Sequence, residues 1–518
     1  MLFFVVLCDG VFFSYKLVPD YSERHGAGVH RKTPITRFFI HLMAHFWEFA
    51  EMTKLHFKSI QTIAEEIRTG EVSPIDLTSY MLDRINTYDG KLKSYVTVMA
   101  DTALAEAKAA EDEIVQGHYR GPLHGVPIAV KDLCFTNGVR TMGGCAVLMD
   151  HVPDFDATVV RRLRDAGAVL LGKLNLTEGA MAGYNPKFDV PENPWKASHW
   201  SGASSSGSGA AAAAGLAFAT LGSDTGGSIR HPAAACGTVG LKPTWGRVSR
   251  HGVLDLAQSL DHVGPLTRCA ADAGIVLQAI AGLDTNDPTT LLDPVPNILA
   301  EVEAGVEGLR IGWDVSYASD GLAPDHAAAV AAGVDVLADL GAEIVSVSMP
   351  QRLAEYLPAW AVLCTAEAAD AHRETYPAQA DEYGPWFREW LARGAAFTAA
   401  DYAQANNLRA ACVGELRQTM QSVDLLACPS TPNAAHSVTP EISYGPIPVD
   451  RDPWQTRFTV PMDFAGLPTI SLPCGLSDNG LPLSLQLAGH ALTEPLLVQA
   501  GTAFERATDW HTMHPPGW

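Results

Sequence analysis

The sequence lacks the short motifs that mark most metal, redox and nucleotide sites. It has nine cysteines in 518 residues, no Cys-x-x-Cys pair, no His-Glu-x-x-His motif and no Gly-x4-Gly-Lys-Ser/Thr phosphate loop. An odd and sparse set of cysteines indicates reduced thiols in a cytoplasmic protein, not a disulfide framework or a zinc site. We therefore expect no metal and no cofactor.

Positive charge is also scarce. The chain carries 36 lysines and arginines against 58 aspartates and glutamates, which gives a formal net charge of −22. A surface of this sign repels nucleic-acid phosphates and anionic lipids, so we expect neither a nucleic acid nor a membrane as partner. Apolar residues make up 47% of the chain, enough for a sizeable core.

No hydrophobic run is long enough to cross a membrane. The segment 1–13, MLFFVVLCDGVFF, has no basic residue before it and falls short of the roughly 18–20 apolar residues of a spanning helix. Residues 1–51 show no clean period, whereas the sequence from Met52 reads like the start of a domain. We expect 1–51 to be an N-terminal extension, non-native or weakly packed, and 52–518 to form the functional domain. Deleting 1–51 should leave activity nearly unchanged.

Helix and strand patterns alternate along the chain and predict an α/β fold. Ser73 and Pro74 are a helix N-cap and a proline at the first helical position, and we expect this helix to run to Tyr88 and stop at Gly90. The other predicted elements are a helix at 100–117, a strand at 125–132, a helix then a strand at 156–175, a strand–helix–strand unit at 309–349, a mostly helical insertion at about 351–422 and a strand pair at 468–489.

Two segments crowd glycine together with small hydroxyl residues. They read WSGASSSGSGAAAAAG at 200–215 and LGSDTGGSIRHPAAACGTVGLKP at 221–243. One interpretation is a set of turns in a large α/β protein. Dinucleotide binding at Gly207, Gly209 and Ala212 is disfavoured, because this loose fingerprint follows a polar loop and not a strand. The third interpretation is nucleophilic catalysis by a serine.

Ser228 has the neighbours that a catalytic serine needs. The two glycines before it allow a tight turn in which the N–H groups of residues 225–228 converge on a developing oxyanion. Each such donor contributes about 3–4 kcal/mol to the lowering of a reaction barrier. Asp224 and Arg230 flank the turn, and we expect them to pair across it and hold it rigid.

Two residues are candidates for the base that activates Ser228. The Gly-x-Ser-x-Gly elbow of the α/β-hydrolases is absent around this serine. His231 lies three residues away, a separation at which it would sooner line the site or pack. Lys131 ends the apolar run GVPIAVKD at 125–132, where burial would disfavour its ammonium form and lower its pKa, as a lysine base requires. Taken alone, a lysine at a strand end is more often a surface charge.

Several motifs, in this order, resemble the amidase signature family. They are GVPIAVKD, GASSSGSGAAAAAG, LGSDTGGSIRHPAAACGTVGLKPTWGRVSR and DHVGPLTR, joined by NPW at 193–195, GLPTISLPCG and FERATDW. The resemblance covers roughly 53–515. It implies an α/β fold with a central twisted mixed β-sheet surrounded by α-helices, and a Ser–cis-Ser–Lys triad.

Matched motif by motif, the resemblance implies a role for each residue of the site. The catalytic residues would be Lys131 as the base, Ser204 as the serine after a cis peptide bond, and Ser228 as the acyl-forming nucleophile. The backbone N–H groups of Thr225, Gly226, Gly227 and Ser228 would form the oxyanion hole, with Ser205, Asp224 and Arg230 in supporting positions. Two glycines usual in the family are replaced here, by Ala203 and Ser206.

The resemblance leaves the substrate less defined. Met142, Gly143, Gly144, Gly179, Ala180 and Met181 are the implied substrate contacts. Amides, esters and carbamates (urethanes) all present a carbonyl to Ser228. The segment 383–394 carries Tyr383, Trp386, Phe387 and Trp390, which indicate either a buried helix face or an aromatic lid over an aryl substrate.

We considered three interpretations of the function. We expect a stand-alone serine hydrolase of amides, a monomer or homodimer. The alternative is the glutaminase component of a tRNA-dependent amidotransferase, which shares the signature and works only with a partner protein. A non-catalytic binding module is disfavoured, because Lys131, Ser204 and Ser228 are all present.

Overall fold

The computed structural model describes residues 55–518, together with the backbone of 3–8 and 11–16. The two short segments pair as an antiparallel hairpin of β1 (Phe3–Cys8) and β2 (Val11–Lys16). The rest of the predicted extension 1–51 lies outside the described residues. The chain divides into the units Met1–Lys54 and Leu55–Trp518, and the site lies in the second.

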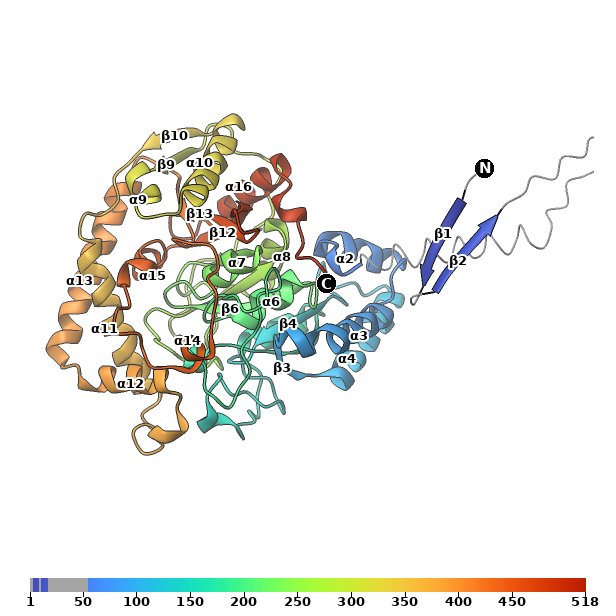
Figure 1. The fold of residues 1–518 in the computed structure, drawn as a ribbon, viewed down its shortest axis with the longest axis horizontal. Coiled ribbons are helices and arrows are strands. Elements are labelled where there is room, and N and C mark those ends of the chain that lie inside the picture. The colour runs from blue at the N-terminus through green and yellow to red at the C-terminus, as the bar shows by residue number, and fades with distance from the viewer. Residues whose placement is uncertain (1–2, 9–10, 17–54) are drawn as a thin grey trace, which may run out of the picture. The chain divides into compact units, whose positions relative to one another are not determined.

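A mixed sheet of eleven strands forms the centre of the second unit, and helices surround it (Figure 1). The strand order is β10-β9-β11-β13-β12-β7-β8-β6-β4-β5-β3. The pairs β10–β9, β9–β11, β6–β4 and β4–β5 are parallel, and the others are antiparallel. The strands are β3 (Tyr95–Val98), β4 (Pro127–Lys131), β5 (Val169–Leu174), β6 (Ala219–Asp224), β7 (Val239–Lys242), β8 (His262–Thr267), β9 (Arg310–Trp313), β10 (Glu343–Ser346), β11 (Leu425–Pro429), β12 (Thr469–Leu476) and β13 (Pro482–Gly489). The predicted fold class is confirmed.

The helices follow the amphipathic patterns closely. The α-helices are α2 (Ile60–Thr69), α3 (Pro74–Leu92), α4 (Ala100–Val115), α5 (Thr158–Asp165), α6 (Ser206–Ala213), α7 (Arg230–Cys236), α8 (Ala270–Ile280), α9 (Val315–Ser319), α10 (Pro324–Asp339), α11 (Leu353–Ala371), α12 (Pro385–Ala396), α13 (Ala399–Met420), α14 (Pro440–Tyr444), α15 (Val460–Ala465) and α16 (Glu494–Ala507). Six short 3-10 helices accompany them: η1 (Leu55–Phe57), η2 (Ala146–Leu148), η3 (Glu178–Ala180), η4 (Ala380–Glu382), η5 (Pro453–Thr456) and η6 (Trp510–Thr512).

One predicted helix end is wrong. Ser73 caps α3 as expected, its hydroxyl accepting from two backbone N–H groups, but the helix passes through Gly90 and ends after Leu92. Leu92 is fully buried. Burying a leucine side chain contributes about 1.5–3 kcal/mol, more than the roughly 1 kcal/mol that a glycine costs inside a helix.

Two elements of the second unit, β4 and α6, position the candidate site residues. Strand β4 is paired on both sides, by β5 and β6, and its last residue, Lys131, is fully buried. Helix α6, built on the alanine run, is buried along its whole length and packs against β6 and α7. Within the described residues, no helix is long and apolar enough to cross a membrane. The same residues contain no group of three or more His, Cys, Asp or Glu side chains that could hold a metal ion.

Candidate active site

Lys131 is held by hydroxyl groups alone. Its side chain is fully buried, and its Nζ atom lies 2.7 Å from Ser204 Oγ, 2.9 Å from Ser205 Oγ and 2.9 Å from Ser223 Oγ. Burial lowers the pKa of Lys131 from 10.5 to about 7, against a weaker opposing pull from Cys134 and more distant acids. The amine is therefore available in its neutral form near neutral pH.

The three hydroxyls come from the turn before α6 and from β6. The Ala203–Ser204 peptide bond is cis, the geometry that the resemblance implies. Ser205 Oγ donates to the carbonyl of Ser223 and accepts from the Ser223 N–H, each at 3.2 Å. The Ser205 hydroxyl proton is already used in the bond to the Ser223 carbonyl, so Ser205 Oγ accepts a hydrogen bond from Lys131 Nζ. Ser223 was not predicted, although a hydroxyl directly before Asp224 was a visible signal.

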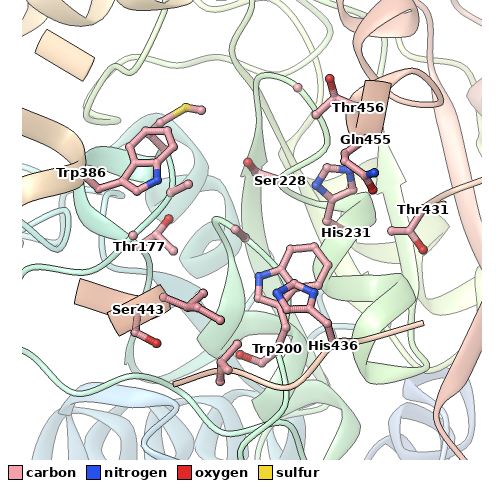
Figure 2. Close-up of a pocket in the computed structure, with 18 of the residues that line it drawn as sticks. Thr177, Trp200, Ser228, His231, Trp386, Thr431, His436, Ser443, Gln455 and Thr456 are labelled. Carbon is pink, nitrogen blue, oxygen red and sulfur yellow. The ribbon is translucent and has the colours of Figure 1, made fainter. Parts of the chain in front are cut away.

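Ser228 lies on the turn between β6 and α7, and its hydroxyl faces a cavity (Figure 2). The backbone of Ser228 adjoins the Lys131 cluster, because the Ser205 N–H donates to the Ser228 carbonyl at 3.3 Å. Within residues 55–518, no hydrogen bond involves the Ser228 hydroxyl. The structure therefore joins Lys131 to Ser204 and leaves Ser228 Oγ open toward the cavity.

Asp224 and Arg230 brace this turn from inside the protein. Arg230 donates to Asp224 through Nε at 3.0 Å and Nη2 at 2.9 Å, and both side chains are fully buried. Asp224 also accepts from the N–H groups of Gly227 at 2.6 Å and Ile229 at 2.9 Å. Burial alone would raise the pKa of Asp224, but Arg230 and these donors hold it well below its usual range.

Three of the four backbone N–H groups predicted to form the oxyanion hole are free, and the fourth, that of Gly227, is not. Thr225, Gly226 and Ser228 have N–H groups without a hydrogen-bond partner in the described chain, whereas the Gly227 N–H donates to Asp224. Gly227 is instead required by its backbone, because its φ is +131°. A side chain at Gly226 would collide with the ring of Trp360, 2.5 Å from an added Cβ. The free donors of this turn are therefore those of Thr225, Gly226 and Ser228.

His231 has no contact that would suit a base for Ser228. Its Nε2 atom lies 3.4 Å from Thr459 Oγ1, and its ring lines the cavity beside Trp200. Burial lowers the pKa of His231 to about 4, so the ring is neutral at neutral pH.

The cavity in front of Ser228 has a volume of about 390 Å³ and three tryptophans in its lining. Trp200, Trp360 and Trp386 line it together with Met181, one of the predicted substrate contacts. Figure 2 shows Ser228 and His231 between Trp386 and a group of polar side chains, Gln455, Thr431 and Thr456.

Five predicted substrate contacts do not line this cavity. Gly143, Gly179 and Ala180 line a separate one of about 320 Å³, and Met142 and Gly144 line neither. The reason is that the two loops bind each other: the Gly179 N–H donates to the Gly143 carbonyl at 2.9 Å. They form a wall away from Ser228.

The aromatic segment is buried, and one of its side chains reaches the cavity. Trp386, Phe387 and Trp390 on α12 are buried, as a core helix face would be. Trp386 alone of these lines the cavity, and Trp390 packs behind it with ring centroids 5.3 Å apart. Other lining residues were missed, because the cavity brings together segments that lie far apart in the sequence. They are Trp200, Trp360 on α11, His436, Arg451 and Gln455 in η5.

Comparison with known proteins places this geometry in a family. The Amidase family model matches residues 76–498. A protein of Mycobacterium tuberculosis named AmiD is 44% identical over 459 residues, covering 88% of this chain and 95% of its own. A glutamyl-tRNA(Gln) amidotransferase subunit of Roseiflexus sp. is 39% identical over 494 residues, covering 90% and 99%. The structure of the peptide amidase from Stenotrophomonas maltophilia matches with a TM-score of 0.77 at 31% identity, covering 89% and 98%. The chain therefore belongs to the amidase signature family and is an amidase, a hydrolase of carbon–nitrogen bonds.

Proposed function

We propose that the chain cleaves small amides through an acyl-enzyme on Ser228, with Ser204 and Lys131 as its proton relay. The observation that carries this proposal is the buried contact of 2.7 Å between Lys131 Nζ and Ser204 Oγ. A lysine with a pKa of about 7 is unprotonated in a large fraction of molecules at neutral pH. Its lone pair then accepts the Ser204 proton, while its two N–H groups donate to Ser205 and Ser223.

During acylation, protons first pass along the relay toward Lys131 and then return when the C–N bond breaks. Ser228 Oγ bonds to the substrate carbonyl carbon as its proton passes to Ser204, whose own proton passes to Lys131. The carbonyl oxygen takes the negative charge and accepts from the free N–H groups of Thr225, Gly226 and Ser228. When the C–N bond breaks, Ser204 protonates the leaving nitrogen and recovers a proton from Lys131.

Deacylation follows the same route with water as the nucleophile. Water gives its proton to Ser204 as it attacks the acyl carbon, and Ser228 takes a proton back as the ester bond breaks. Because no residue within 55–518 bonds the Ser228 hydroxyl, we propose that its contact with Ser204 forms when the substrate is bound. Catalytic hydrogen bonds often close only in such complexes.

The cavity supports an aryl or other apolar substrate. Trp200, Trp360 and Trp386 offer flat faces for stacking, and a volume of about 390 Å³ suits a small molecule. Esters and aryl carbamates present the same carbonyl and have better leaving groups than amines, so we propose them as further substrates.

A panel assay tests this proposal. The purified chain is given a p-nitroanilide, a p-nitrophenyl ester, a simple primary amide and an aryl carbamate, with Ser228→Ala as the control. We expect turnover of at least the anilide by the chain alone, and none by the variant. Turnover retained in Ser228→Ala would overturn the assignment of the nucleophile.

A second candidate function is that of an amidotransferase component, because the glutamyl-tRNA(Gln) amidotransferase relative is 39% identical across 90% of this chain. In that function the chain would release ammonia from glutamine and need partner proteins. A panel without turnover, but with glutaminase activity on adding such partners, would favour it.

A further inference from the structure

The cavity in front of Ser228 contains one fixed charge, and that charge is positive. Among the described residues that line the cavity, Arg451 is the sole member of the Asp, Glu, Lys and Arg set. Three histidines also line the cavity, His199, His231 and His436. Burial lowers the pKa of His231 to about 4 and that of His436 below its usual 6.5. In a chain with a net charge of −22, an acid-free cavity with a single cation is unusual.

Arg451 has no partner for its charge. Its side chain forms no ion pair and no hydrogen bond to any residue within 55–518. Its guanidinium carbon lies 5.7 Å from the ring centroid of Trp386 and 5.9 Å from that of Trp390, an arrangement typical of cation–π contact. The nearby charged group that acts on it is another cation, Arg393.

A neighbouring arginine shows what a structural role would look like. Arg457 also stacks on an aromatic ring, 4.1 Å from the centroid of Phe458, but it donates to the carbonyls of Trp454 at 3.1 Å and Asp320 at 2.9 Å. Arg451 has the stacking contact without such acceptors. Its N–H donors are therefore free to meet a group that enters the cavity.

We infer that Arg451 binds a carboxylate of the substrate, on the part of the molecule away from the scissile carbonyl. A guanidinium presents its donors as a planar fork that matches the two oxygens of a carboxylate. One unpaired positive charge is balanced by one negative charge, which favours a carboxylate over a doubly charged phosphate. As a statement about turnover this inference rests on the proposed function, but the binding itself does not.

The test compares acids with neutral analogues of the same shape. Succinanilic acid is paired with 4-oxopentananilide, and 4-acetamidobenzoic acid with 4-acetamidoacetophenone, so that a methyl ketone replaces the carboxylate in each pair. The first pair places the charge on the acyl side and the second on the amine side. Calorimetry gives Kd for all four on the full chain carrying Ser228→Ala, alone and combined with Arg451→Gln, Arg451→Lys or Arg373→Gln.

We expect the acid of at least one pair to bind roughly tenfold to a hundredfold more tightly than its ketone. Arg451→Gln should remove this preference, and Arg451→Lys should retain part of it. The control Arg373→Gln removes an equal charge from an exposed arginine that pairs with Asp370, and it should leave the preference unchanged.

Two results would overturn the inference. One is a Kd ratio near one for both pairs before any change at Arg451, a result that does not depend on how well the variants fold. The other is an acid preference that survives Arg451→Gln. Failure of the proposed function is read separately, as release of aniline or 4-aminobenzoate by the Ser228→Ala protein.

Discussion

Lys131 and Lys173 are both fully buried, but only Lys173 has a carboxylate beside it. Its Nζ lies 3.3 Å from Asp132 Oδ1, whereas Lys131 contacts three serine hydroxyls and forms no ion pair in the described chain. Hydroxyls stabilise an ammonium far less than a carboxylate does. Burial lowers the pKa of both amines, but Asp132 opposes the shift at Lys173, whereas no such carboxylate touches Lys131, whose pKa falls to about 7.

The first prediction is an acid limb in the rate profile that belongs to Lys131. The protonated amine cannot accept from Ser204, so kcat/KM should fall tenfold per pH unit below about 7 and level off above it. Lys131→Met should lower kcat by roughly 10²–10⁴. Steady-state kinetics from pH 5 to 9 on a neutral anilide check both points. A flat wild-type profile would contradict the assignment of the base.

Ser223 should tune this limb without being essential. Its hydroxyl accepts from Lys131, and hydrogen bonds of this kind favour the charged amine. Ser223→Ala should therefore shift the acid limb to lower pH, with a fall in kcat of about tenfold. Ser208→Ala is the matched control, because Ser208 is equally buried but its hydroxyl donates to the Leu221 carbonyl, away from Lys131. Equal profiles for the two variants would argue against a role for Ser223.

Asp224→Asn should destabilise the fold as well as the site. It leaves Arg230 buried with one of its two carboxylate partners, the other being Asp463. We expect a loss of about 3–5 kcal/mol in the free energy of unfolding in urea. Because the native pKa of Asp224 is lowered, its stabilisation is complete above the usual 3.8 and is lost only as pH falls toward the native value. An unchanged free energy at pH 7 would contradict this account of the turn.

Changing Trp386 or Trp390 to alanine should have different effects, one on substrate binding and the other on stability. Trp386 lines the cavity, so Trp386→Ala should raise KM for an aryl amide by roughly fivefold to twentyfold. Trp390 is fully buried behind it, so Trp390→Ala should mainly cost about 3–5 kcal/mol of stability. The comparison needs KM for an aryl and a small aliphatic amide, with unfolding curves for both variants. A KM that rises equally for both substrates would reject stacking on Trp386.

The alternation of helices and strands was predictable, because such patterns carry their meaning within a few residues. The grouping of Lys131 with Ser204 came from the family resemblance instead, because a lysine that ends an apolar run is by itself more often a surface charge. The cavity could not be predicted in this way. Arg451 and Trp200 lie far apart in the sequence and line the same cavity only in the folded chain. The Gly227 N–H is not a free donor, because it donates to the Asp224 carboxylate.

The central claim is that neutral Lys131 activates Ser228 through Ser204, and the labelling of Ser228 tests it most directly. A fluorophosphonate reacts with the activated serine, and mass spectrometry gives the rate and the modified residue. We predict that the rate rises with a midpoint near pH 7, and that in Lys131→Met it becomes slow and loses this midpoint. A Lys131→Met protein that labels at Ser228 with the wild-type rate and the same midpoint would contradict the claim.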